Sequence, residues 1–348
     1  MNLSSKVAAG LIVTAALVAL GTASGKSKNP PAPQAPDSAA VSAAERSLDS
    51  LAATERAFAA MSVEQGMKPA FLNYLGRDGL VFRRGIVNGR KVWEARKNAT
   101  GTLNWAPEFA EVAGNADLGW TTGPWEYKPP AGNDQPDYGT FVTVWGRPIE
   151  FVKEQDRVWR VVIDMGISHP RHGFNVSDVK LERGPLHPPV PLMRAPGVGF
   201  GVGVANGGFG LSVGTGRSAR DIRWREMRHA VNDMMSTERS YGFDLQKKGA
   251  SEAIGTYAAD DIRLFREGVE PSVGKMPAIQ ALATSNRDRV WTPLGSNVST
   301  SYDLGASWGL VRTRTAPRDT SAYLHIWRCP GGKWLLVADV ENRFAPGH

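Results

Sequence analysis

The chain has 348 residues, of which 42% are hydrophobic and 22% are charged, and its formal net charge is +7. This composition excludes a wholly disordered chain, and the length is that of two domains rather than one. Because Cys329 is the only cysteine, an intramolecular disulfide framework and a cysteine-rich zinc site are excluded as well.

The first 41 residues predict an export signal followed by a spacer. Residues 1–24 combine Lys6, an apolar stretch over 7–20 and a small-residue end, which is the pattern of a secretory signal peptide. A retained anchor is the alternative reading, although the stretch is shorter than the roughly 20 residues that a membrane span needs. Residues 25–41 are rich in proline and predict a disordered spacer. We therefore expect an exported protein, either periplasmic or secreted.

The rest of the chain contains the same pattern twice. With a shift of 183 positions, residues 54–85 share ten identities with residues 237–268 over 32 positions. Further along, the stretch at Asp117 matches the stretch at Asp303 in the same order. A kept order with changed loop lengths is what a tandem duplication produces. The predicted parts are a first domain over 42–168, a Pro/Gly-rich connector over 169–219 and a second domain over 220–345.

Each copy begins with helical periodicity and continues with strands. Apolar residues at helical spacing predict long helices over 42–66 and 224–249, which Gly66 and Gly249 are suited to end. A short second helix is predicted over 69–75. The strand candidates of the first copy are 80–83, 103–112, 118–127, 139–147 and 158–167. Helices followed by antiparallel strands predict an α+β fold and argue against a doubly wound α/β sheet.

This order of elements resembles the nuclear transport factor 2-like superfamily, which includes ketosteroid-isomerase-like and SnoaL-like proteins. The matching stretches are Glu55–Phe58, Asp117–Gly123, Val144–Trp145, and Trp159 together with Asp164. The resemblance is closest to exported members of unknown function, and it is weaker in the second copy. It implies two cone-shaped domains, each a curved antiparallel sheet wrapped around N-terminal helices. It implies no single function, because this fold hosts enzymes, binding domains and assembly domains.

The connector has an unusual glycine-rich part. Residues 198–216 contain eight glycines among 19 residues and no charge. One interpretation is a flexible linker. The other is a glycine-faced hairpin that turns at Asn206 and Gly207 and packs on another surface or contacts a membrane.

The polar residues that both copies share are the best candidates for chemistry. Tyr74 and Tyr257 lie on the short helices, and Asp164 and Asp339 lie near the ends of the last strands. A tyrosine and a carboxylate in an apolar cavity can transfer a proton at the carbon next to a carbonyl group, as they do in ketosteroid isomerase. For Tyr74 and Asp164 this predicts isomerase, dehydratase or cyclase chemistry. The alternative is structural, because a strand-end aspartate also caps turns or pairs with arginine.

Aromatic residues in both copies predict apolar pockets inside the cones. The pocket candidates are Phe58, Trp105, Trp120, Trp145, Tyr257, Trp291, Trp308 and Trp327, together with Asp339. For each single tryptophan, packing in the core is the alternative interpretation.

Other kinds of site find little support in the sequence. The glycines at 199–203 do not complete a dinucleotide-binding motif that opens a helix, and no P-loop pattern is present. His169, His172 and His187 lie in a proline-broken segment without metal-ligand spacing, so we expect neither a metal nor another cofactor. Basic and acidic residues are mixed, and no nucleic-acid partner is expected.

The function expected first is that of a non-catalytic binding protein. Its cones would take a small apolar ligand or a protein partner, and its two sheets would pack together as a dimer within one chain. The alternative is an enzyme of the isomerase, dehydratase or cyclase type that uses Tyr74 and Asp164. A weaker alternative is association with the cell envelope through 198–216.

Overall fold

The computed structural model describes residues 38–344 apart from short gaps. These gaps cover 83–84, 98–99, 131–134, 149–152, 154–156, 171–174, 176–177, 189–199, 206–207, 214–218, 286–287 and 316–318. The predicted signal peptide, most of the proline-rich spacer and the tip of the predicted hairpin therefore lie outside the described residues. Within the described ranges, no helix is both long enough and apolar enough to cross a membrane.

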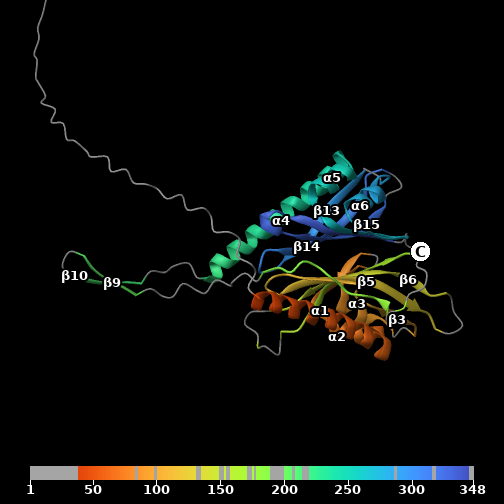
Figure 1. Cartoon of the computed structure of the whole chain (residues 1–348), viewed down its shortest axis with the longest axis horizontal. Helices are drawn as coiled ribbons and strands as arrows, with labels where there is room; N and C mark the ends of the chain where they lie inside the picture. The colour runs from red at the N-terminus through yellow and green to blue at the C-terminus, as the bar shows by residue number, and fades with distance from the viewer. Residues whose placement is uncertain are drawn as a thin grey trace, which may run out of the picture. The chain divides into compact units, whose positions relative to one another are not determined.

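The N-terminal repeat consists of three helices and one sheet. The helices α1 (Ser38–Gln65), α2 (Met67–Tyr74) and α3 (Gly89–Ala95) cover one face of the sheet (Figure 1). The strands are β1 (Leu75–Phe82), β2 (Ile86–Asn88), β3 (Thr102–Trp105), β4 (Phe109–Val112), β5 (Leu118–Lys128), β6 (Asp137–Gly146) and β7 (Arg160–Ser168). β1 runs parallel to β7, whereas β4 to β7 pair antiparallel in chain order. The connector adds β8 (Glu182–Arg183) parallel to β4 at the edge.

The C-terminal repeat has the same order of elements. Its helices are α4 (Ala219–Lys247), α5 (Ala250–Tyr257) and α6 (Lys275–Leu282). Its strands are β11 (Ala258–Arg266), β12 (Val269–Val273), β13 (Arg289–Val298), β14 (Leu304–Thr313), β15 (Thr320–Arg328) and β16 (Leu335–Arg343), and a short 3₁₀ turn, η3 (Pro330–Gly332), precedes β16. β11 again runs parallel to the last strand, and the others pair antiparallel. Between the repeats, β9 (Phe200–Ala205) pairs antiparallel with β10 (Gly208–Val213).

The predicted α+β fold and internal duplication are confirmed. In both repeats a long and a short helix precede a largely antiparallel sheet, which is the element order of the nuclear transport factor 2-like fold. Gly66 and Gly249 both take positive φ, 90° and 94°, where the long helix turns into the short one. Only glycine takes this backbone conformation at little cost, which explains why both copies keep it.

Two local features differ from the sequence prediction. The strand expected over 103–112 is divided into β3 and β4, and Pro107, which has no amide hydrogen to give to a ladder, lies in the break. The helix α3 was not expected from the periodicity, because it is only seven residues long. Its N-cap is Asn88, whose side chain accepts a hydrogen bond from the Lys91 amide at 3.0 Å. Asparagine is a favoured N-cap residue, so the sequence does contain a signal for the start of this helix.

Three clusters of buried hydrophobic residues hold the fold together. One lies between α1–α3 and the first sheet, and one lies between α4–α6 and the second sheet. We name the space enclosed between helices and sheet the N-terminal cone and the C-terminal cone. The third cluster joins the opposite faces of the two sheets and includes Trp120, Val142, Ile163, Ala306, Leu324 and Val340.

Candidate functional site

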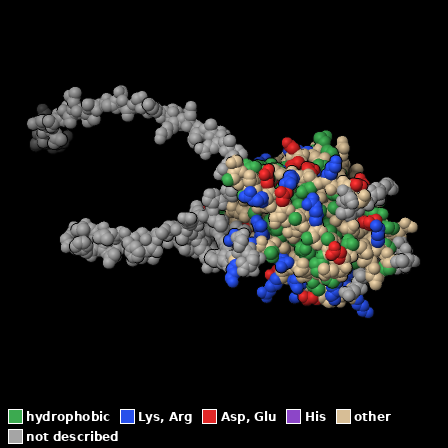
Figure 2. Space-filling view, turned by 60° about the horizontal axis from the view of Figure 1, so that its bottom comes forward, with side chains coloured by type: hydrophobic (Ala, Val, Ile, Leu, Met, Phe, Trp, Pro, Cys, Tyr) green, Lys and Arg blue, Asp and Glu red, His purple; other side chains and the backbone are tan. Residues whose placement is uncertain are grey.

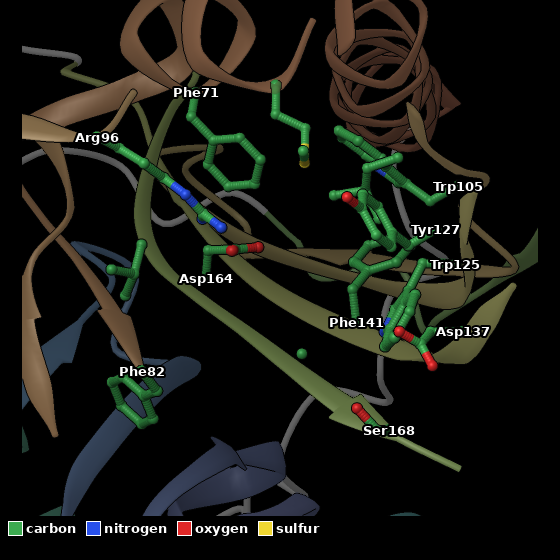
Figure 3. A pocket seen from close by; sticks show the side chains of 14 residues that line it. Phe71, Phe82, Arg96, Trp105, Trp125, Tyr127, Asp137, Phe141, Asp164 and Ser168 are labelled. Atoms are coloured by element: carbon green, nitrogen blue, oxygen red, sulfur yellow. The ribbon is translucent and has the colours of Figure 1, made fainter. Parts of the chain in front are cut away.

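The N-terminal cone contains a cavity of about 350 Å³. Helix α2, the strands β1, β3, β5, β6 and β7 and the residue after α3 all contribute to its wall (Figure 3). The apolar lining consists of Met67, Phe71, Val81, Phe82, Leu103, Trp105, Trp125 and Phe141. The polar lining consists of Arg96, Tyr127, Asp137, Asp164 and Ser168. An apolar cavity with a few converging polar groups is the usual form of a small-molecule site.

Of the two residues predicted for catalysis, Asp164 is the one that lines this cavity. It comes from β7, and the Thr143 hydroxyl on the neighbouring strand donates to its Oδ1 at 3.2 Å. Tyr74, its predicted partner, is not among the lining residues. The Tyr74 ring instead stacks on Phe58 with ring centroids 4.8 Å apart and meets Trp145 edge-on at 6.3 Å. The two residues proposed for proton transfer therefore hold different positions relative to the cavity.

Behind the cavity wall lies a buried carboxyl group that the sequence analysis did not single out. Glu55 of α1 accepts hydrogen bonds from Trp105 Nε1 at 2.7 Å, Thr121 Oγ1 at 2.5 Å and Trp145 Nε1 at 2.9 Å. Burial raises the pKa of Glu55 to about 7, because the loss of hydration outweighs the three hydrogen bonds that favour the ionised form. Since Trp105 also lines the cavity, one ring joins the ligand space to this carboxyl group.

The other aromatic candidates of the first repeat are divided between two faces of the sheet. Phe58 and Trp145 are buried beside Trp105, behind the cavity wall. Trp120 lies on the opposite face, where its Nε1 donates to Glu111 at 3.0 Å. Successive side chains of a strand alternate in direction, so Thr121 and Trp125 face the cone while Trp120 faces the other repeat.

In the C-terminal cone, charged side chains stand at several inward positions whose counterparts line or adjoin the N-terminal cavity. Glu238, the counterpart of Glu55, accepts from Ser307 Oγ at 2.6 Å and from Trp327 Nε1 at 3.1 Å. It also lies 2.9 Å from His325 Nδ1, and the second nitrogen of that imidazole lies 3.5 Å from Asp339. Burial alone would lower the pKa of His325, but the two carboxylates raise it to about 9. The ring is therefore a buried imidazolium that bridges two acids.

Arginines complete this network. Arg266 Nη2 lies 2.8 Å from Asp339 Oδ1, and Arg289 pairs with Glu341, whose side chain is also close to Arg266. Burial opposes ionisation of Asp339, but Arg266 and His325 hold its pKa well below the usual range. With these partners Asp339 is held in its ionised form, and removing one partner would leave a buried charge uncompensated.

The remaining predicted residues of the second repeat take several roles. The Tyr257 hydroxyl donates to Asp244 at 3.1 Å, near the end of α4. Trp327 is buried beside Glu238. Trp308 packs against the cluster between the sheets, on the face opposite to the cone. Trp291 lines a pocket of about 170 Å³ between α4 and β13, whose lining also includes the buried Glu238 and the exposed Phe243.

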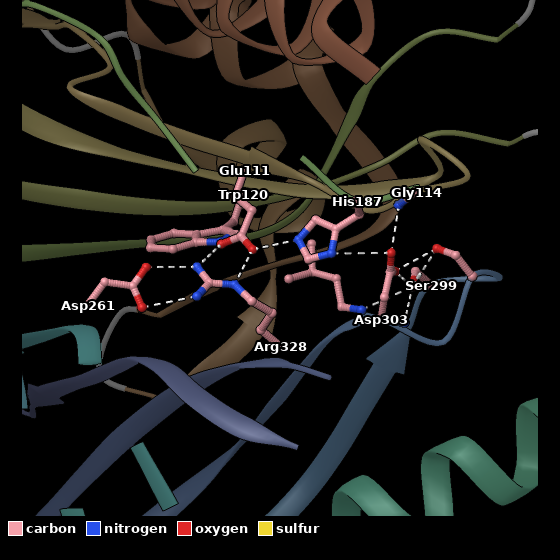
Figure 4. A network of polar contacts seen from close by, with 10 residues as sticks. Glu111, Gly114, Trp120, His187, Asp261, Ser299, Asp303 and Arg328 are labelled. Atoms are coloured by element: carbon pink, nitrogen blue, oxygen red, sulfur yellow. Dashed lines mark hydrogen bonds and ion pairs between the residues drawn. The ribbon is translucent and has the colours of Figure 1, made fainter. Parts of the chain in front are cut away.

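A second polar network lies between the two repeats (Figure 4). Arg328 of β15 donates to both oxygens of Glu111 in β4, at 2.5 and 2.8 Å, and to both oxygens of Asp261 at 3.0 Å. His187 of the connector lies 2.8 Å from Glu111 and 3.5 Å from Asp303. Burial opposes the ionisation of Glu111, but Arg328 and His187 lower its pKa to about 2. Because the pairing is bidentate and satisfied on both sides, it fixes the position of β4 against β15.

Two equivalent loops next to this network bind each other reciprocally. The Asp117 carboxylate accepts from the Thr300 amide at 2.9 Å, and the Asp303 carboxylate accepts from the Gly114 amide at 2.9 Å. Asp117 corresponds to Asp303, and residue 114 corresponds to residue 300, in each case with a shift of 186. Each aspartate of the duplicated Asp-Leu-Gly sequence thus binds the backbone of the other repeat.

The buried glutamates have a recognisable signal in the sequence. The buried residues of α1 recur at helical spacing and are Leu48, Leu51, Ala52, Glu55, Phe58, Ala59 and Ser62. A glutamate inside such an apolar stripe, identical in both copies, indicates a buried acid with a required partner. Trp125 and Arg96 left no comparable signal, because neither is shared between the copies.

Metal and surface features add no further site. Within the ranges that the structure describes, no group of three or more histidine, cysteine, aspartate or glutamate side chains is arranged to hold a metal ion. Basic and acidic side chains are interspersed on the face shown in Figure 2.

No protein-family model matches the chain, and no curated protein matches it. Among solved structures, a ketosteroid isomerase-like protein from Erwinia carotovora atroseptica is 16% identical, with a TM-score of 0.30; the match covers 33% of this chain and 96% of that one. A nuclear transport factor 2-like protein of unknown function from Shewanella oneidensis is 11% identical over 32% of this chain and 97% of its own, with a TM-score of 0.28.

A third solved structure matches a slightly larger part of this chain. This nuclear transport factor 2-like protein from Novosphingobium aromaticivorans is 13% identical over 37% of this chain and 89% of its own, with a TM-score of 0.29. Each of the three corresponds to about one third of the chain, the extent of one repeat.

Proposed function

We propose that this chain is a binding protein whose N-terminal cone takes a small, largely apolar molecule. The observation that carries the proposal is the cavity of about 350 Å³, walled mainly by aromatic and aliphatic side chains. Its volume falls in the range of roughly 300–1,000 Å³ that is common for ligand sites. The wall also carries charged groups that can orient a bound molecule: Arg96, which points toward Asp164 in Figure 3, and Asp137.

The C-terminal cone supports this proposal by contrast. The position of Gly166 is taken there by Glu341, and the position of Leu103 is taken by Arg289, as the strand registers show. These two charged side chains pair inside the second repeat. We therefore assign ligand binding to the first repeat and a structural role to the second.

The experiment transfers this pair to the first repeat. The variant carrying Leu103→Arg and Gly166→Glu copies Arg289 and Glu341 into the N-terminal cone. N-phenyl-1-naphthylamine, an uncharged dye that fluoresces in apolar sites, is titrated into wild type and variant. We expect one bound dye per wild-type chain and at least about a tenfold loss of affinity in the variant, since the cavity is occupied.

A matched control and a contradicting result define the test. Val269 is half exposed on the second repeat, so Val269→Ser should leave the dye affinity unchanged. A melting temperature of the double variant close to that of wild type shows that the fold is kept. Equal dye binding by wild type and a folded double variant would remove the N-terminal cone as the site.

Proton transfer is a second candidate, and the placement of Asp164 favours it. This carboxyl group lines an apolar cavity, where a carboxylate can remove a proton next to a carbonyl group. In D₂O, an enzyme of this kind exchanges the methyl protons of 2-acetylnaphthalene, and Asp164→Asn abolishes the exchange while dye binding persists. Exchange at the rate of buffer alone would leave binding as the function.

Export and partner contacts rest on the sequence. We propose that residues 1–24 direct the chain to the periplasm or the exterior, which N-terminal sequencing of the mature protein tests. We also propose that the two sheets form a pseudo-dimer within the chain. Contact of 198–216 with a membrane is tested by deleting this segment and measuring the membrane-bound fraction.

A further inference from the structure

An unused hydrogen-bond donor lies in the wall of the N-terminal cavity. The Nε1 atom of Trp125 is buried, and among the residues that the structure describes it has no hydrogen-bond partner. Trp125 comes from β5 and lines the cavity. A buried indole N–H normally finds an acceptor, because leaving it unpaired carries an energetic cost that a bound acceptor removes.

The surrounding backbone holds this donor in place. Gly139 pairs with Trp125 across β5 and β6, and a Cβ at Gly139 would lie 2.5 Å from Cζ2 and 2.6 Å from Cε2 of the indole. Any side chain at position 139 would therefore displace the ring. Only glycine allows the indole to lie directly on the neighbouring strand, which fixes the direction of its N–H.

Open space adjoins the donor. Gly166 of β7 also lines the cavity, and a Cβ built there would have only one atom within 4 Å, which is Trp125 Nε1 at 3.7 Å. A ligand atom above Gly166 is thus within reach of the indole N–H. At this point the cavity wall therefore presents an N–H donor next to open space.

In the second repeat, a side chain of the protein itself occupies the position equivalent to Gly166. Glu341 takes the place of Gly166 and brings carboxylate oxygens into the cone. It needs Arg266 and Arg289 as partners, and the place of Trp125 is taken by Val311. In the first repeat Gly166 brings no side-chain acceptor and Leu103 takes the place of Arg289, while Arg83, the sequence counterpart of Arg266, lies outside the described residues. The described wall offers a neutral donor here, Trp125 Nε1.

The charges around the donor select the acceptor. Asp137 and Asp164 line the same cavity as the Trp125 indole (Figure 3). The charged side chains that line the cavity are thus two acids and one arginine, Arg96, so a ligand carboxylate or phosphate meets more negative than positive charge there. An uncharged oxygen meets no such repulsion.

We propose that the N-terminal cone recognises apolar molecules that carry an uncharged carbonyl oxygen, and that Trp125 Nε1 donates a hydrogen bond to that oxygen. This inference rests on the proposed binding function and specifies its ligand class. Trp125 is the residue that distinguishes a carbonyl compound from a hydrocarbon of the same shape.

The test uses two probes that differ in the acceptor alone. Isothermal titration calorimetry compares 2-acetylnaphthalene with 2-isopropylnaphthalene on the full chain. We expect wild type to bind the ketone about tenfold more tightly, the ratio that one net hydrogen bond of average strength gives. In Trp125→Phe, which keeps an aromatic ring, the two affinities should agree within about twofold.

Controls separate this inference from the binding function itself. Trp291→Phe removes an indole from the second repeat and should keep the wild-type preference. In wild type, the ¹H–¹⁵N indole signal that is missing in Trp125→Phe should shift with the ketone and not with the hydrocarbon, a readout that does not depend on the stability of the variant. Equal binding of both probes by wild type, or an unchanged preference in Trp125→Phe, would overturn the role of Trp125 while leaving the cavity as a site. If neither probe binds, the binding function fails as well.

Discussion

Glu55 and Glu238 occupy the same position in the two repeats, yet their carboxyl groups meet different surroundings. Both accept hydrogen bonds from a tryptophan indole and from a hydroxyl group. Glu55 has no buried cation beside it among the partners described, and burial raises its pKa to about 7. Burial would raise the pKa of Glu238 in the same way, but the neighbouring His325 lowers it.

Four positions account for the difference between the cones. The pairs, first repeat before second, are Phe58 and Tyr241, Leu103 and Arg289, Thr143 and His325, and Gly166 and Glu341. Each change adds polar or charged atoms to the second cone, where Tyr241 donates to Asp339 and Arg289 pairs with Glu341. The two repeats thus share one order of elements, while the first cone holds the larger cavity, about 350 Å³, and the second holds an ion network beside a pocket of about 170 Å³. The lesson is that the occupant of a cone is set by a few inward side chains and not by the fold.

Replacing the bridging histidine should have the largest effect. His325→Thr copies Thr143 into the second cone and leaves Glu238 and Asp339 buried with one cation fewer. Removing one partner of a buried charge network typically costs about 3–5 kcal/mol, and we expect a loss of this size in urea unfolding. Thr143→Ser, the matched change in the first cone, should cost less than about 1 kcal/mol. A similar cost for both variants would show that Arg266 alone balances the two acids.

The pH dependence of stability should distinguish the two glutamates. Because the pKa of Glu55 is raised from 4.5 to about 7, its contribution to stability is complete below pH 4.5 and is lost as the pH rises through 7. The shift in the pKa of Glu55 corresponds to a loss of about 3 kcal/mol in the free energy of unfolding as Glu55 ionises. Glu55→Gln should abolish this loss between pH 5 and 8. Glu238 has a lowered pKa, so its contribution is present above pH 4.5 and is lost toward acid pH.

Urea unfolding at pH 5, 6.5 and 8 measures these slopes. In this range, Glu55→Gln should flatten the slope. Glu238→Gln should change the slope through its partner, because the pKa of His325 falls when Glu238 no longer raises it. Parallel slopes for wild type and Glu55→Gln would mean that Glu55 is ionised throughout, and the contrast between the cones would then lie in their volume alone.

The sequence was sufficient to predict the fold, because the evidence for it is local. Helical spacing, strand alternation and glycines at the helix junction recur in both copies and predict the α+β order. The cavity was harder to predict, since its wall combines residues from α2 to β7 whose neighbourhood depends on strand register. Trp120 and Trp125 illustrate this: an odd separation on one strand places them on opposite faces, but the sequence alone does not tell which face is the cone.

The buried charges were missed for a different physical reason. A single acidic residue within a helix is usually exposed, and its burial becomes evident only when the donors that satisfy it are placed. The donors of Glu55 come from β3, β5 and β6, 50 to 90 residues further along the chain. His187 was interpreted as a loop residue because the proline-rich connector hides its contact with Glu111 of β4.

The smallest effect is expected where the two repeats remain equivalent. Asp117→Ala removes one of the two reciprocal hydrogen bonds and leaves the Thr300 amide without its acceptor, which should cost about 1–2 kcal/mol. Asp303→Ala should cost more, because Asp303 also contacts Ser299 and His187. Neither change touches a residue of the cavity wall, so both variants should bind the uncharged dye with an affinity within about twofold of wild type. A dye affinity that falls together with stability in Asp117→Ala would show that the contact between the repeats shapes the N-terminal cone, and the cones would then have to be treated as one coupled unit.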